Sequence, residues 1–165
     1  MRKHFAALAL ALAMAAPAAA QPAEEGQAVV DAWIAEFTDG DVAAIVDLYL
    51  PEALVWVTSG RTLSTGTEAF TTYFTNVLGA ADYTSTLLDH SVLAVSDTIV
   101  VSAGRIDVLN VGTGAVSMFR YHFVLVRGAD GAWKIAAHHS SRLPDPPATP
   151  AAAPATPAPA AAPAR

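Results

Sequence analysis

The stretch FRYHFVLVRGADGAWKIAAHHSSRLP, residues 119–144, decides the fold of this chain. Two apolar runs, rich in β-branched and aromatic residues, flank GADG (residues 128–131), whose glycines and aspartate are typical of a turn. The stretch therefore predicts an antiparallel hairpin of two strands. It closes on HHSSRLP (residues 138–144), where four consecutive side chains can give or take protons.

Strand alternation divides these closing residues between two faces. His138 and Ser140 are expected to point to one face of the last strand, and His139 to the other. A four-residue loop sets Tyr121 opposite His138, whereas a two-residue turn sets Phe123 there. In either register, His138 shares a face with both aromatic rings.

The same alternation conflicts with the apolar half of the last strand. Trp133 and Ile135 have the character of core residues, yet strict alternation places them with Arg120 and His122 on the face opposite His138. Either both faces are covered, one by helices and one by a partner subunit, or a bulge between Ile135 and His138 switches the alternation.

Three helices and one strand are predicted before this hairpin. Apolar residues recur with helical spacing over residues 24–40, which end in a glycine. Asp41 is expected to cap a second short helix, which Pro51 ends, and Thr67 to cap a third. ALVWVT, residues 53–58, has the composition of a strand. The apolar stripes of these helices are Val30, Trp33, Ile34, Phe37, Val42, Ile45, Val46, Tyr49, Phe70, Tyr73, Phe74 and Val77.

After the third helix the apolar pattern changes to the period of strands. Four strand-like runs cover residues 85–96, 98–110, 116–127 and 132–140, and turn residues separate them. Helix, helix, strand, helix and then four antiparallel strands is an α+β layout. It predicts a curved sheet with the three helices of the N-terminal half packed on one face.

Both ends of the chain differ from its middle. A basic start and an apolar run that closes on three alanines predict a secretory signal peptide over residues 1–20. Residues 144–165 are almost wholly Pro and Ala, which predicts a disordered tail. One domain, residues 21–143, remains. The protein is expected to be secreted, and periplasmic in a Gram-negative cell.

Charge and composition exclude several classes of partner. Without the two basic residues of the predicted signal peptide, 7 Lys and Arg face 15 Asp and Glu, a net charge of −8. The basic residues are scattered, so nucleic acid is not an expected partner. No later stretch is long enough to span a bilayer, so the mature form is not expected in a membrane. The chain has no cysteine, no GxSxG motif and no dinucleotide fingerprint.

The element order and residues 119–144 together resemble the nuclear transport factor 2-like superfamily. The Arg-Tyr-x-Phe-Val strand, the Gly-x-Trp turn and the His-His-Ser-Ser close are similar to one branch of it. That branch contains the association domain of calcium/calmodulin-dependent protein kinase II and SnoaL-like bacterial relatives. The resemblance implies a cone-shaped fold and self-association through the sheet, as a homodimer or larger ring. It favours partner coverage as the explanation for Trp133 and Ile135.

The same branch includes the iota-class carbonic anhydrases, which share the His-His-Ser-Ser close and in some members work without a metal. The resemblance implies four catalytic residues here: Thr58, Tyr73, His138 and Ser140. It implies reversible hydration of carbon dioxide to bicarbonate. In this scheme His138 accepts a proton from water with an unperturbed pKa near ~6.5, and Ser140 holds the water or the bicarbonate.

Other readings stay open. A zinc site would need three convergent ligands, and His90 and His122 have no spacing that gathers them, so no cofactor is predicted. The main alternative is a non-catalytic small-molecule-binding or self-association domain of the SnoaL-like type. A polyketide-cyclase-like or isomerase-like enzyme would need an aspartate deep in the cone, either Asp89 or Asp107. Arg120 is expected to pair with an acid such as Asp107 across the sheet.

Overall fold

The structure, a computed structural model, describes residues 20–144. The predicted signal peptide up to residue 19 and the predicted tail beyond Pro144 lie outside the described residues. The elements in chain order are α1 (Ala20–Asp39), α2 (Val42–Asp47), β1 (Tyr49–Trp56), α3 (Thr67–Leu78), β2 (Tyr83–Ser96), β3 (Ile99–Asn110), β4 (Val116–Arg127) and β5 (Trp133–Arg142). This order confirms the predicted α+β layout.

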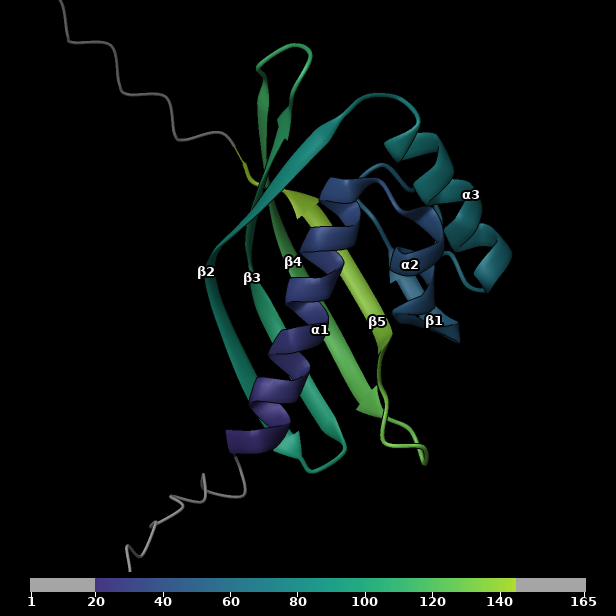
Figure 1. Ribbon diagram of the computed structural model, residues 1–165, viewed down its shortest axis with the longest axis vertical. Coiled ribbons are helices and arrows are strands. Elements are labelled where there is room, and N and C mark those ends of the chain that lie inside the picture. The colour runs from purple at the N-terminus through teal and green to yellow at the C-terminus, as the bar shows by residue number, and fades with distance from the viewer. Residues whose placement is uncertain (1–19, 145–165) are drawn as a thin grey trace, which may run out of the picture.

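The five strands form one curved sheet, which is not closed, in the order β1-β5-β4-β3-β2. The last four strands are antiparallel neighbours, as predicted, whereas β1 runs parallel to β5. Figure 1 shows α1 lying along the sheet and α2 and α3 grouped near β1. Below, the inner face is the face of the sheet that packs against the helices, and the outer face is the opposite one.

The helices stay on the inner face because each long helix carries one apolar stripe. Val30, Trp33 and Phe37 of α1 and Phe70 and Phe74 of α3 are buried, as predicted. Burial of each such side chain contributes about 1.5–3 kcal/mol to folding. Their partners in the same core are residues of the strands, among them Val100, Ile106, Tyr121, Phe123, Leu125 and Ile135.

The transition from α2 to β1 comes earlier than predicted. Asp41 caps α2 as expected, accepting a backbone N–H of the first turn at 2.9 Å. The carbonyl of Leu48 accepts the N–H of Ile135 at 2.8 Å, which draws the chain into the sheet. Tyr49 therefore begins β1 and does not belong to the helix, and Pro51 lies within that strand.

The start of α3 also differs from the prediction. Gly66 occupies the N-cap position with a φ of 94°, a conformation that favours glycine. Thr67 is the first helical residue, and its side chain does not cap the helix.

A bulge in β5 decides which side chains reach the inner face. β4 pairs Val124 with Ala137 but Leu125 with Ile135, so Ala136 is an extra residue in β5. Because side chains alternate along a strand, one extra residue moves everything after it to the other face.

This bulge removes the conflict between the apolar and polar halves of β5. Trp133 and Ile135 before it and His138 after it are all buried on the inner face. The prediction that Trp133 and Ile135 share a face with Arg120 and His122 is therefore wrong. Of the two explanations, the bulge is correct, and coverage by a partner subunit is not needed for their burial.

Candidate functional site

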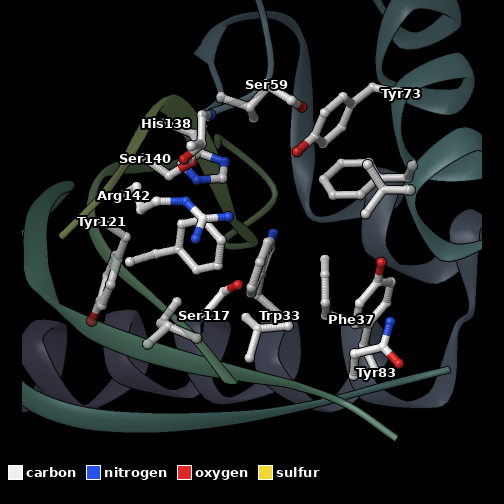
Figure 2. Close-up of a pocket in the computed structure, with 18 of the residues that line it drawn as sticks. Trp33, Phe37, Ser59, Tyr73, Tyr83, Ser117, Tyr121, His138, Ser140 and Arg142 are labelled. Atoms are coloured by element: carbon white, nitrogen blue, oxygen red, sulfur yellow. Dashed lines mark hydrogen bonds between the residues drawn. The ribbon is translucent and has the colours of Figure 1, made fainter. Parts of the chain in front are cut away.

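A cavity of about 370 Å³ lies inside the cone, between the helices and the inner face of the sheet. Aromatic and aliphatic side chains form most of its wall, and polar groups gather where the β1–α3 loop meets the end of β5 (Figure 2). The aromatic part of the wall comes from Trp33, Phe37, Tyr73, Phe74, Tyr83, Phe119 and Tyr121.

All four predicted site residues line this one cavity. His138 and Ser140 come from β5, Thr58 follows β1, and Tyr73 comes from α3. The parallel pairing of β1 with β5 sets Val55 opposite His138, which brings the end of β1 beside the His-His-Ser-Ser close. The fold thus gathers groups that lie as much as 82 residues apart in the sequence.

Thr58 and Ser140 form a hydrogen-bonded pair at this polar end. Ser140 Oγ accepts the Thr58 N–H at 3.2 Å and lies 3.1 Å from Thr58 Oγ1. The contact between the two hydroxyls uses only one of their hydrogens, so the second hydroxyl hydrogen can bind a ligand.

Tyr73 reaches the same end of the cavity from α3, and Figure 2 shows its hydroxyl near Ser59. Burial raises the pKa of the Tyr73 hydroxyl, and a hydrogen bond from Ser59 offsets part of that increase. The phenol is therefore protonated at neutral pH and can donate a hydrogen bond.

His138 is fixed by a chain of buried hydrogen bonds. Trp33 Nε1 donates to Tyr49 Oη at 2.7 Å, and Tyr49 Oη lies 2.8 Å from His138 Nδ1. Trp33 can only donate, so the Tyr49 hydroxyl accepts there and satisfies all three groups if it donates to Nδ1. We assign the tautomer from this network: Nδ1 accepts, and Nε2 carries the ring hydrogen.

The surroundings of His138 keep its ring neutral. The pKa of His138 is lowered to about 3, mainly by burial among the rings of Trp33, Tyr49 and Phe123 and to a smaller extent by the neighbouring His139. The expected pKa near ~6.5 is therefore wrong, because a charged imidazole would lose its solvation there. Burial also raises the pKa of Tyr49, so that residue remains a donor.

The predictions missed two residues of this site. Tyr49 was assigned to a helix, although it supports His138 from the first strand. Arg142 is not among the predicted site residues, but it lines the cavity, with Cζ 5.6 Å from the ring centroid of Phe119. Alternation could have found Arg142, since it follows Ser140 by two positions on the same strand.

Other polar residues of the last two strands lie on the outer face, away from the cavity. His139 is exposed there, and Arg120 Nε donates to Ser141 Oγ at 3.0 Å. Arg120 does not pair with Asp107, because the register sets it opposite Arg105. Asp107 pairs instead with Arg105, whose Nε lies 3.5 Å from Asp107 Oδ1.

No carboxylate lies among the residues that line the cavity. Asp89 and Asp107, the aspartates considered for an isomerase-like site, both pair with Arg105, at 3.7 and 3.5 Å. Within residues 20–144, no group of three or more His, Cys, Asp or Glu side chains is placed to hold a metal ion. No helix in the same range combines the length and the apolar character needed to cross a membrane.

The sequence profile of the SnoaL-like domain matches residues 27–146 of this chain. The chain belongs to the SnoaL-like domain family. No curated protein matches the sequence. This SnoaL-like domain is similar to several solved structures that share the nuclear transport factor 2-like fold.

Three of these solved structures illustrate how their descriptions and their sequence identities to this chain vary. A candidate calcium/calmodulin-dependent protein kinase II association domain from Xanthomonas campestris is 27% identical, covers 73% of this chain and 87% of its own, and has a TM-score of 0.68. A nuclear transport factor 2-like protein of unknown function from Pseudomonas putida KT2440 is 15% identical, with coverages of 74% and 87% and a TM-score of 0.68. A candidate aromatic ring hydroxylase from Novosphingobium aromaticivorans is 19% identical, with coverages of 75% and 90% and a TM-score of 0.63.

Proposed function

We propose that this SnoaL-like domain binds a small organic molecule in its cavity and holds an oxygen of that molecule with neutral hydrogen-bond donors. The observation that carries the proposal is the chain from Trp33 through Tyr49 to His138. It occupies Nδ1 and leaves the Nε2–H as the free polar group of a ring that lines the cavity.

The composition of the wall supports the same proposal. Small-molecule sites are typically concave and mostly apolar, with a few placed polar groups that orient the ligand. Here Tyr73, Thr58 and Ser140 add donors beside His138, while the aromatic wall takes the remainder of the molecule. Donors fixed in a partly dry site stabilise negative charge that develops on a bound oxygen, so the arrangement also suits a reaction through an oxyanion.

The hydration of carbon dioxide is the second candidate. Its support is that the four residues implied by the likeness to iota-class carbonic anhydrases line one cavity. His138 is a poor proton acceptor in this setting, because its pKa is lowered to about 3. In this candidate, His138 would therefore hold bicarbonate as a donor, together with Ser140 and Thr58, and the proton lost by the attacking water would pass to solvent or buffer instead of to His138.

The test uses 2-naphthamide, a neutral ring compound with one carbonyl, and isothermal titration of the purified protein. We expect His138→Leu, which removes the donor but fills the space, to weaken binding about 5- to 30-fold, the effect of one buried hydrogen bond. His139→Leu is the matched control, since His139 is exposed on the outer face. Absence of binding, or equal loss in both variants, would contradict the proposal.

The same two variants decide the second candidate. Stopped-flow hydration of carbon dioxide, with and without a chelator, should show turnover that resists the chelator and that falls in His138→Leu but not in His139→Leu. A wild-type protein that does not accelerate hydration removes this candidate and leaves the binding proposal to the titration.

We also propose that the protein self-associates through the outer face of its sheet. Within the described residues no helix packs on that face, and it carries exposed apolar side chains, among them Leu54, Trp56, Val116 and Met118. The name of the Xanthomonas campestris relative, an association domain, supports this proposal. Uncovered apolar patches commonly mark protein interfaces.

A further inference from the structure

Arg142 is the one cation among the residues that line the cavity, and no anion accompanies it there. Three other basic side chains in residues 20–144 form ion pairs with acids: Arg105 with Asp89 and Asp107, Arg127 with Glu25, and Lys134 with Asp47. Arg142 forms no ion pair within that range. Its positive charge is therefore available to bind a negatively charged group of a ligand in the cavity.

Arg142 is an exposed residue of the cavity wall, and its guanidinium packs along that wall. Its Cζ lies 5.6 Å from the ring centroid of Phe119, its register partner on β4. This cation–π contact favours a position over the cavity wall. Figure 2 shows the side chain extending toward the middle of the cavity, on the same side as Ser140 and His138.

The spacing along β5 sets the shape of a ligand. His138, Ser140 and Arg142 occupy alternate positions after the bulge, so all three face inward. The first and the last are four residue steps apart on an extended strand, about 13 Å between their Cα atoms. A molecule with an apolar body of one or two rings could lie between an anionic group at Arg142 and the donors around His138.

We propose that the natural ligand of this cavity is an organic carboxylate with an apolar ring-sized body, held through its carboxylate by Arg142. A guanidinium presents paired N–H donors that match the two oxygens of a carboxylate. Because Arg142 is exposed, solvent partly screens this attraction, and the apolar wall of the cavity contributes the contact with the body of the ligand. This inference rests on the proposed small-molecule-binding function and adds the chemical class of the ligand.

The test compares 2-naphthoate with 2-naphthamide, which share a ring system but differ in charge, by isothermal titration at pH 7.5. In the wild type we expect 2-naphthoate to bind about tenfold more tightly or better, the effect of one charge-assisted contact. Arg142→Gln should remove this preference, measured as the ratio of the two dissociation constants, so that the two compounds then bind equally tightly. Arg120→Gln is the matched control, because Arg120 lies on the outer face, and it keeps the preference.

The outcomes separate this inference from the function on which it rests. If 2-naphthamide binds and 2-naphthoate binds no more tightly, the cavity is a binding site and the carboxylate inference is overturned. Equal loss of preference in Arg142→Gln and Arg120→Gln also overturns it, since the effect would then come from net charge alone. If neither compound binds, both the proposed function and this inference are overturned.

Discussion

At the scale of single residues, His138 shows how burial changes the chemistry of a side chain. The ring lies among three aromatic neighbours, with Nδ1 held by Tyr49. Its pKa is lowered to about 3 because the charged form would lose its hydration. The residue that the sequence presents as a proton acceptor is thus better suited to donate a hydrogen bond.

This burial predicts a dependence of stability on pH. The unfolded chain takes up a proton at His138 near pH ~6.5, whereas the folded protein does so only near pH 3. The unfolded state therefore binds more protons between these values, and stability is lost as the pH falls below ~6.5. For His138 alone we expect the free energy of unfolding to be about 2 kcal/mol lower at pH 5 than at pH 7.5.

Urea denaturation at pH 5 and at pH 7.5 measures this loss. His138→Gln should remove most of the difference between the two pH values, since glutamine does not titrate. His139→Gln should keep it, because His139 is exposed on the outer face. The same pH difference in His138→Gln as in the wild type would show that other groups cause it.

At the scale of elements, the bulge in β5 places both halves of that strand on the inner face. Trp133 and Ile135 reach the core before Ala136, and His138 reaches the cavity after it. A regular strand would expose one half or the other, because side chains alternate with a period of two. The bulge therefore supports both the packing and the site.

Deletion of Ala136 should be strongly destabilising. Either the apolar pair or His138 would then face outward, and the loss of burial of Trp133 and Ile135 alone costs about 3 kcal/mol or more. Ala136→Ser, which keeps the number of residues, is the control and should change the free energy of unfolding by less than about 1 kcal/mol. Denaturant unfolding followed by circular dichroism provides the measurement, and a deletion variant as stable as the control would contradict the role of the bulge.

At the scale of the whole molecule, the sheet is covered on one face only in the described part of the chain. Trp56 is 49% exposed on the outer face, between the buried inward side chains of Val55 and Val57. A large aromatic side chain in such a position is a typical centre of an interface.

Trp56→Lys should therefore weaken self-association. Sedimentation equilibrium should give the wild type a mass of at least two chains, and we expect the variant to dissociate at concentrations at least tenfold higher, an effect typical of a central interface residue. Leu63→Lys, at a similarly exposed loop position, is the control and should retain the wild-type mass. A monomeric wild type, or equal dissociation in both variants, would contradict an interface at this face.

The sequence by itself determined the order of the elements and named four residues that the fold brings to one cavity. Periodicity placed the helices and the four antiparallel strands, because the burial of one face imposes a repeat that can be read locally. The His-His-Ser-Ser close and its likeness to known relatives named Thr58, Tyr73, His138 and Ser140, and all four line the cavity. The signal peptide, the tail and the catalytic role stay predictions.

Only the tertiary structure decided which face the last strand presents and what state His138 adopts. The bulge at Ala136 depends on the pairing of β5 with its neighbours, which no local pattern records. The lowered pKa of His138 depends on Trp33 and Tyr49, which are distant in sequence and come close only in the folded core. The side chain of Arg142 lies on the same face as His138 because both follow the bulge at alternate positions of β5. Hydrogen bonding and desolvation act through space, so they become visible only once the chain is folded.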